Sequence, residues 1–189
     1  MNRVLKRLSA LSLCGMCWSI SGSSLYAESQ DLIVGEKAPS FRLRTLDGAM
    51  FRLDEHAYPG REKSYAKKRP VLLEFFRTDC APCLRAMPDL VRMARTQETP
   101  RLEIVVIALL EEEEGEVKLR KYLKQAQLPF TVLVDATEYV AKKYLGNPIT
   151  LPASFLISPD GVLLKKANGA VSNVSDYYQS VLVSLQDKP

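Results

Sequence analysis

The feature that most constrains the fold is an apolar run followed closely by two cysteines. Residues 71–76 are apolar except for Glu74, which is typical of a strand buried on both faces of a sheet. Cys80 and Cys83 follow after a short loop, and the apolar residues beyond them have helical spacing. The pattern predicts a strand, a loop and a helix that begins at a Cys-x-x-Cys pair, which suits thiol–disulfide chemistry.

Residues 1–27 have the three parts of a secretory signal peptide. Three basic residues come first, residues 8–20 form an apolar segment of 13 residues, and a small, polar segment ends at Ala27. We expect cleavage after Ala27, export to the periplasm or another extracytoplasmic space, and a mature domain over residues 28–189 without a stable membrane anchor. The alternative is an uncleaved anchor, for which the apolar segment is short.

Export changes the cysteine count, since Cys14 and Cys17 lie inside the signal. Neither follows the small residue of a lipoprotein signal, so we expect no lipid anchor. The mature chain then holds only Cys80 and Cys83, which are too close in sequence to stabilise the fold by closing a loop. A structural zinc site needs four ligands, and His56 is the single histidine, so we expect no metal and no cofactor.

The charge of the chain gives no basis for binding nucleic acid. The formal net charge is +4, but without the three basic residues of the signal there are 23 basic and 22 acidic residues, a net charge of +1. The most basic stretch, residues 61–69, is expected to be a solvated surface loop; the alternative is a docking patch for an acidic partner. The acidic run 111–116 suits a helix N-terminus, and a metal site there is the weaker alternative.

The order of the expected elements indicates an α/β sandwich with a mixed sheet. Helical connections between apolar strands imply parallel pairing, and a late hairpin adds antiparallel strands. The expected elements in chain order are a hairpin (41–53, turning at Asp47–Gly48), a strand (71–76), a helix from the cysteines kinked at Pro88, a strand (102–110), a helix over 119–126, a strand (131–134), a helix (139–145) with Asp135 as its cap, a strand ending at Ile157 that pairs with 162–164, and a helix over 174–185.

The two cysteines have different expected roles. At a helix N-terminus the free backbone N–H groups and the dipole lower the pKa of the Cys80 thiol from its usual value near ~8.5. Two intervening residues place Cys83 one turn along, close enough for a disulfide. We expect Cys80 to be the exposed attacking nucleophile and Cys83 the more buried resolving thiol. Ala81 and Pro82 tune the redox poise, and Pro82 fits the first turn because its missing N–H would be unpaired there.

Two further positions support this chemistry. Burial of Glu74 in its apolar strand should raise the pKa of the carboxyl, so that it can exchange a proton with a nearby thiol near neutral pH. The alternative is that Glu74 pairs with a lysine at the edge of the sheet. Pro152 follows Leu151 at the start of a strand. A cis peptide bond there would place the Leu151 backbone beside the cysteines, where it can bind an extended substrate strand.

Together these motifs resemble the thioredoxin superfamily, and within it the TlpA/ResA/CcmG-type exported thiol–disulfide oxidoreductases. The resemblance implies the thioredoxin fold, a mixed central sheet flanked by helices, with an N-terminal β-hairpin extension. It covers a core of roughly residues 34–186. The motifs that carry it are Gly35-x-x-Ala38-Pro39-x-Phe41-x-Leu43 with Leu46-Asp47-Gly48, residues 71–76 with Cys80-Ala-Pro-Cys83, Met87-Pro88, and residues 151–157 with Asp160-Gly161.

The resemblance also implies roles. In that family the first cysteine attacks, the second resolves, the proline at the position of Pro152 is cis, and an acidic residue at the position of Glu74 assists proton transfer. Members commonly keep the thiols of exported protein clients reduced, as in cytochrome c maturation, with electrons from a membrane thiol donor. We therefore expect a monomeric reductase. The family usually has Trp where this chain has Asp79, whose carboxylate disfavours the Cys80 thiolate, although Arg77 and Arg85 offset it.

Three other functions fit the sequence less well. A peroxiredoxin-like peroxidase shares the hairpin and strand, but its motif has a Thr two residues further from the cysteine than Thr78 is from Cys80. A copper chaperone of related fold would bind Cu(I) through soft thiolates, but typically spaces its cysteines further apart and adds a histidine, whereas His56 is expected in a loop. A structural adaptor leaves the close cysteine pair unexplained.

Overall fold

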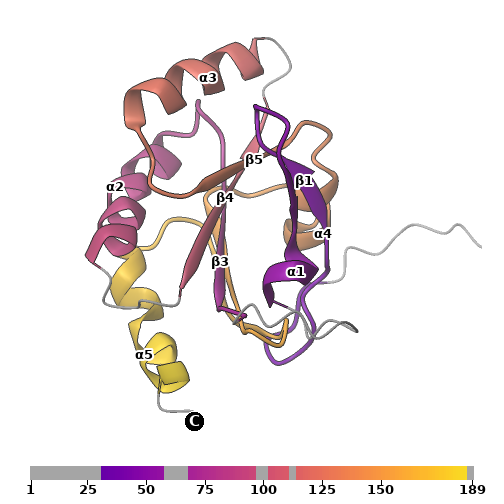
Figure 1. Cartoon of the computed structure of the whole chain (residues 1–189), viewed down its shortest axis with the longest axis vertical. Helices are drawn as coiled ribbons and strands as arrows, with labels where there is room; N and C mark the ends of the chain where they lie inside the picture. The colour runs from indigo at the N-terminus through magenta and orange to yellow at the C-terminus, as the bar shows by residue number, and fades with distance from the viewer. Residues whose placement is uncertain (1–30, 58–67, 97–101, 111–113, 187–189) are drawn as a thin grey trace, which may run out of the picture.

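A computed structural model describes residues 31–57, 68–96, 102–110 and 114–186 (Figure 1). The expected signal peptide, most of the basic segment 61–69 and glutamates 111–113 lie outside the described residues. The described strands form one seven-stranded sheet. Their order across it is β2 (Met50–Arg52), β1 (Arg42–Arg44), β5 (Thr131–Asp135), β4 (Glu103–Leu109), β3 (Val71–Phe76), β6 (Ala153–Ile157) and β7 (Leu163–Asn168).

The sheet is mixed, as the order of elements predicts. Strands β3, β4 and β5 are parallel and are linked through helices, whereas β6 runs antiparallel to both β3 and β7. The N-terminal hairpin of β1 and β2 joins the other side of the sheet by an antiparallel pairing of β1 with β5. Strand β3 therefore lies in the interior of the sheet, which is why all six of its residues are buried.

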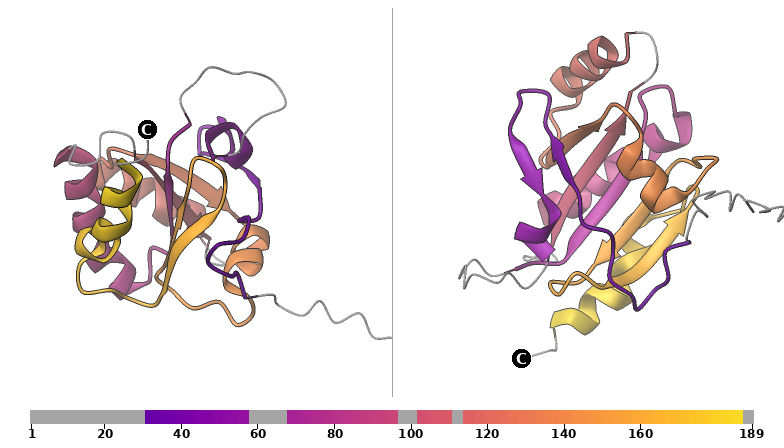
Figure 2. Two further views of the ribbon diagram at one scale, coloured as in Figure 1. Left: turned by 90° about the horizontal axis from the view of Figure 1, so that it is seen from below. Right: turned by 90° about the vertical axis from the view of Figure 1, so that its right-hand side faces the viewer.

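Helices cover both faces of the sheet (Figure 2). The shorter helices α1 (Leu53–Ala57) and α4 (Tyr139–Leu145) cover one face, and the longer helices α2 (Ala81–Thr96) and α5 (Val174–Gln186) cover the other. Helix α3 (Gly115–Ala126) adds Leu119 to the core under α2 and α5. In the part of the chain that the structure describes, none of the helices has the length and apolarity needed to cross a lipid bilayer.

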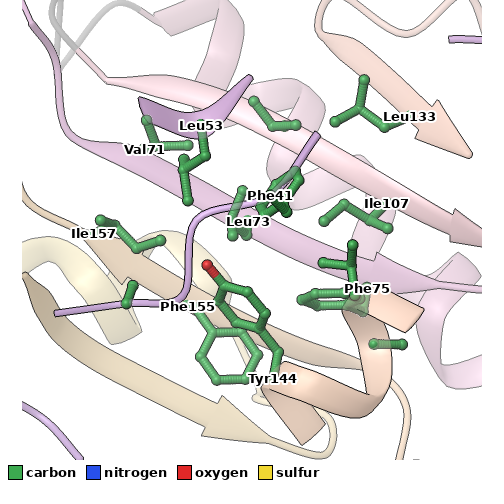
Figure 3. Packing of buried hydrophobic residues seen from close by; sticks show 14 of the residues in the cluster. Phe41, Leu53, Val71, Leu73, Phe75, Ile107, Leu133, Tyr144, Phe155 and Ile157 are labelled. Carbon is green, nitrogen blue, oxygen red and sulfur yellow. The ribbon is translucent and has the colours of Figure 1, made fainter. Parts of the chain in front are cut away.

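Aromatic side chains fill the core under α1 and α4 (Figure 3). The rings of Phe75 and Phe155, from neighbouring strands, meet edge to face with centroids 5.8 Å apart. Tyr144 of α4 packs edge-on against Phe155 at 5.1 Å. Its hydroxyl donates a hydrogen bond to the Pro39 carbonyl at 2.6 Å, so the buried phenol is satisfied. This layer ties α4 and the N-terminal segment to the strand that leads to the cysteines.

The opposite face of β3 carries the residues that support the site. Side chains alternate between the two faces of a strand, so Glu74 projects to the same side as Leu72 and Phe76. Those two residues belong to the core cluster under α2 and α5, which also contains Cys83 and Tyr178. The single carboxyl of β3 is thus on the side of the sheet that holds the buried cysteine.

The predicted fold is confirmed, with two local corrections. Leu53 was expected to end the hairpin strand, but it begins α1; its N–H still donates to the Phe41 carbonyl at 3.2 Å, and the acids that follow favour a helical first turn. The last strand was expected to stop at residue 164, but β7 continues to Asn168. Its two lysines obscure the apolar alternation, while the backbone remains paired with β6. Asp135 caps α4 from the end of β5, as expected.

Candidate active site

The cysteines lie where α2 begins. Cys80 is the residue before the helix, and its carbonyl accepts the first helical hydrogen bond, from the Leu84 N–H at 3.0 Å. The pair forms a disulfide with an S–S distance of 2.06 Å and a Cα–Cα distance of 5.2 Å. The Cys83 N–H donates to the Cys80 Sγ at 3.3 Å, so the sulfur takes the place of an N-cap oxygen. After reduction the same N–H and the helix dipole favour a Cys80 thiolate.

The two sulfurs differ in accessibility. Cys83 is 1% exposed and belongs to the core, whereas Cys80 is half-buried. Cys80 also lines an open pocket of about 470 Å³ on the surface at this end of the sheet. A partner molecule can therefore reach Cys80 and not Cys83. The residues lining the pocket are Arg77, Asp79, Cys80, Ala81, Pro82, Leu109, Glu138, Ile149 and Leu151.

The segment before β6 forms another wall of this pocket through Leu151. The Leu151–Pro152 peptide bond is cis. Pro152 itself is buried, and its carbonyl accepts the Gly169 N–H at 2.8 Å. The structure thus brings Leu151 to the same pocket as Cys80, although 71 positions separate them in the sequence.

Glu74 is buried on the face of the sheet that also holds Cys83, with 3% of its surface exposed. Burial raises the pKa of its carboxyl to about 8, and a hydrogen bond from Ser154 lowers the pKa by less than burial raises it. One carboxyl oxygen, Oε2, is buried without a hydrogen-bond partner. Within the described ranges the structure shows no lysine bound to Glu74, so the alternative of an ion pair at the sheet edge finds no support there.

Asp79, the departure from the usual Trp, lies at the rim of the pocket. Its Oδ1 is 3.2 Å from the Arg77 Nε, and both side chains are roughly half exposed. The cation next to Asp79 partly balances its charge close to Cys80. Arg85, the other arginine expected to offset Asp79, is exposed on α2.

His56 lies far from the cysteines. Its Nδ1 is 2.7 Å from the carboxylate of Glu103, the first residue of β4, whereas Leu109 at the other end of β4 lines the cysteine pocket. A copper site that combines Cys80, Cys83 and His56 is therefore not possible in this fold. Among the described residues, no three His, Cys, Asp or Glu side chains gather in a way that could hold a metal ion.

Sequence reasoning missed two residues next to Glu74. Ser154 is opposite Glu74 in the antiparallel pairing of β3 with β6, and its hydroxyl is 2.8 Å from the Tyr178 hydroxyl. Tyr178 lies in the helix predicted over residues 174–185, where it belongs to a stripe of apolar residues with helical spacing. A tyrosine in such a stripe does signal a buried hydroxyl that needs a partner, but the partner depends on strand register.

A helix-capping disulfide after an interior strand of this sheet defines the class: the protein is a thiol–disulfide oxidoreductase of thioredoxin fold. Residues 34–166 match the AhpC/TSA family, and the chain belongs to that family. Among curated proteins it is similar to a thiol-disulfide oxidoreductase ResA of Bacillus cereus, 29% identical over 169 residues, which cover 89% of each chain. ResA of Bacillus subtilis (strain 168) is 25% identical over 167 residues, covering 87% of this chain and 84% of ResA.

Two solved structures have folds similar to that of this chain. A putative thiol:disulfide interchange protein DsbE from Chlorobium tepidum is 25% identical, with a TM-score of 0.64 over 82% of this chain and 99% of its own. StoA from Bacillus subtilis is 20% identical, with a TM-score of 0.59 over 76% of this chain and 96% of its own, and supports the fold alone. The predicted resemblance to TlpA/ResA/CcmG-like proteins is confirmed.

Proposed function

We propose that this protein reduces disulfides of exported protein clients through the Cys80/Cys83 dithiol. The observation that carries the proposal is the contrast between the two sulfurs: Cys80 borders an open pocket, and Cys83 is buried. An attacking thiol must reach its client, whereas a resolving thiol needs to reach only its neighbour. The names of the curated relatives, thiol-disulfide oxidoreductase, agree with this chemistry.

The reaction uses two exchanges. The Cys80 thiolate attacks one sulfur of the client disulfide, forming a mixed disulfide and releasing the other client sulfur as a thiolate, which takes a proton from solvent. The Cys83 thiol then gives its proton to the Glu74 carboxylate, and its sulfur attacks the Cys80 sulfur. This attack re-forms the Cys80–Cys83 disulfide and releases the second client thiolate, which takes up a proton. The client gains two electrons, and the dithiol loses two.

The pocket provides a place for the client. The Leu151 backbone, beside Cys80, would pair with an extended client segment, and Pro152 holds this segment at the head of β6. Ala81 and Pro82, in the first turn of α2, and Asp79, before it, would set the redox poise by their effect on the Cys80 thiolate.

The setting of the reaction follows from the N-terminal sequence. The signal-like residues 1–27 support an exported domain over residues 28–189, in the periplasm or another extracytoplasmic space, which we propose to act as a monomer. Outside the cytoplasm the dithiol needs a source of electrons, which we propose to be a membrane thiol donor. Apocytochrome c, whose haem attachment requires free thiols, is the proposed example of a client.

Reduction of insulin by the full-length protein, with dithiothreitol as electron source, tests the proposal. Cys80→Ser should abolish the activity. Reduced Cys83→Ser, mixed with insulin after dithiothreitol is removed, should accumulate a mixed disulfide with insulin, and dithiothreitol added afterwards should release it. Unchanged activity of Cys80→Ser would refute the dithiol mechanism. Consumption of hydrogen peroxide that survives Cys83→Ser would favour a peroxidase instead. A redox titration of the Cys80/Cys83 couple gives the direction: a strongly oxidising couple would refute the proposal of a reductase.

A further inference from the structure

Three polar side chains form a continuous line of hydrogen bonds in the core under α2 and α5. Glu74 comes from β3, Ser154 from β6 and Tyr178 from α5. Ser154 hydrogen-bonds to the Glu74 carboxyl, and the Ser154 and Tyr178 hydroxyl oxygens are 2.8 Å apart. Glu74 and Ser154 are each 3% exposed, and Tyr178 is 0% exposed. Polar groups buried this deeply destabilise a core unless they are paired, so their alignment calls for a reason beyond packing.

The number of hydroxyl hydrogens determines which group donates in each of the two hydrogen bonds. An ionised carboxylate only accepts hydrogen bonds, so the single hydroxyl hydrogen of Ser154 must point to Glu74 when Glu74 is charged. The Ser154 oxygen then has no hydrogen left for Tyr178, so Tyr178 must be the donor to Ser154. Burial raises the pKa of the Tyr178 phenol, so its hydroxyl keeps the hydrogen that this arrangement needs.

Among the described residues, Ser154 is the side chain that hydrogen-bonds to the Glu74 carboxyl. Cys83 of α2 belongs to the core cluster on the same face of the sheet, and on β4 the residue paired with Glu74 is the apolar Val106. Beyond Tyr178, the Lys165 ammonium of β7 lies 6.0 Å from the Tyr178 ring centroid and 4.0 Å from the Tyr177 ring centroid. Lys165 donates to the Tyr177 carbonyl, and the Tyr177 hydroxyl donates to the Lys166 carbonyl, so neither reaches Glu74.

We propose that Ser154 and Tyr178 are positioning residues for Glu74: they hold its charged form in the core and so set the pH at which it can accept the Cys83 proton. This inference rests on the proposed function and names the groups that tune its proton-transfer step. Ser154 acts directly on the carboxylate by donating a hydrogen bond. Tyr178 acts through Ser154, because its own hydrogen bond fixes and polarises the serine hydroxyl.

An NMR titration of the Glu74 carboxyl carbon tests the inference without measuring activity. The full-length oxidised protein is labelled in its glutamates, and Glu74→Gln assigns the signal. With Ser154→Ala the titration midpoint should move upward by about one pH unit, since a hydrogen bond to a charged group is lost. With Tyr178→Phe it should move in the same direction by about half as much. The Ser154→Ala, Tyr178→Phe double variant should match Ser154→Ala alone.

Matched variants separate positioning from packing. Tyr177→Phe removes a neighbouring hydroxyl that bonds elsewhere, so the Glu74 midpoint should stay within error of the parent protein. Ser154→Thr keeps the hydroxyl and Ser154→Val does not, although both add the same volume. The threonine variant should retain the parent midpoint, and the valine variant should shift it. If Ser154→Ala does not fold, the Ser154→Thr and Ser154→Val variants still test the inference.

Two results would overturn the inference: equal midpoints in Ser154→Thr and Ser154→Val, or a Tyr178→Phe midpoint no different from that of Tyr177→Phe. The proposed function would fail if Cys80→Ser still reduced insulin, and that result would leave the Glu74 titration midpoints unaffected. If the midpoints shift as expected, the pH profile of insulin reduction should move with them in the same order of variants.

Discussion

Replacing Glu74 by Gln should make the stability of the oxidised protein less dependent on pH. Burial raises the pKa of Glu74 from 4.5 to about 8 in the folded chain. Below pH 4.5 both the folded and the unfolded chain hold the proton, so ionisation of the carboxyl does not disfavour folding. As the pH rises toward 8, the unfolded chain releases the proton and the folded chain keeps it, so the free energy of unfolding falls. Above pH 8 the free energy of unfolding lost through Glu74 no longer changes with pH.

The size of this effect follows from the two pKa values. The loss relative to acid conditions is about 1 kcal/mol at pH 5 and about 3 kcal/mol at pH 7, since one pKa unit corresponds to ~1.36 kcal/mol. Glu74 is almost wholly buried, so solvent screens the effect little. Gln is neutral at every pH and close in shape, so the variant should lack this loss.

Urea unfolding of the two proteins at pH 5 and pH 7, with the disulfide intact, measures the difference. The parent protein should lose about 2 kcal/mol more than Glu74→Gln over this range, because all other titrating groups are shared. Glu36→Gln, which alters an exposed carboxylate, should follow the parent protein. Parallel pH dependences for the parent protein and Glu74→Gln would show that the carboxyl titrates as it does in water, and would refute the reasoning from burial.

Two further predictions concern Asp79 and Asp135. Asp79→Asn removes a negative charge beside Cys80, so in the reduced protein the pKa of the Cys80 thiol should fall by a few tenths of a unit; the shift is small because Arg77 already balances the charge. The pH dependence of iodoacetamide alkylation measures it, and an upward shift would contradict this picture. Asp135→Ala should lower the free energy of unfolding by about 2 kcal/mol, because the buried carboxylate accepts two backbone N–H groups of α4, at 3.1 and 2.8 Å. Urea unfolding checks this, and a loss below about 0.5 kcal/mol would contradict it.

The sequence was sufficient to predict the fold because the strongest local patterns coincide with the most buried elements. The apolar run 71–76 became the interior strand β3, and the stripe of the last helix became the buried face of α5. The two errors in the predicted fold concern the ends of elements. The β7 lysines hid the continuation of a predicted strand from residue 164 to Asn168, because at an edge the backbone pairing, not the side-chain pattern, maintains the strand.

The candidate site was predictable where its parts are adjacent in sequence. Cys80 and Cys83 are three positions apart, and their helix start is a local feature. The contacts of Ser154 and Tyr178 with the site could not be predicted, because they depend on the strand register that places Ser154 opposite Glu74. That register depends on long-range packing. A serine in a strand and a tyrosine in an apolar stripe have no local pattern that reveals such a partnership.

The hairpin of β1 and β2 is held to the sheet by a short junction. Its register with β5 consists of one residue pair, Arg44 with Val134, and Phe41 and Phe51 anchor it further in the core. If the hairpin opened, β5 would become an exposed strand edge, able to pair with another chain. Closed, the hairpin presents as its own edge the three-residue β2, which ends in the charged Arg52. The extension therefore gives this side of the sheet a short, charged edge, which is poorly suited to pairing with another chain.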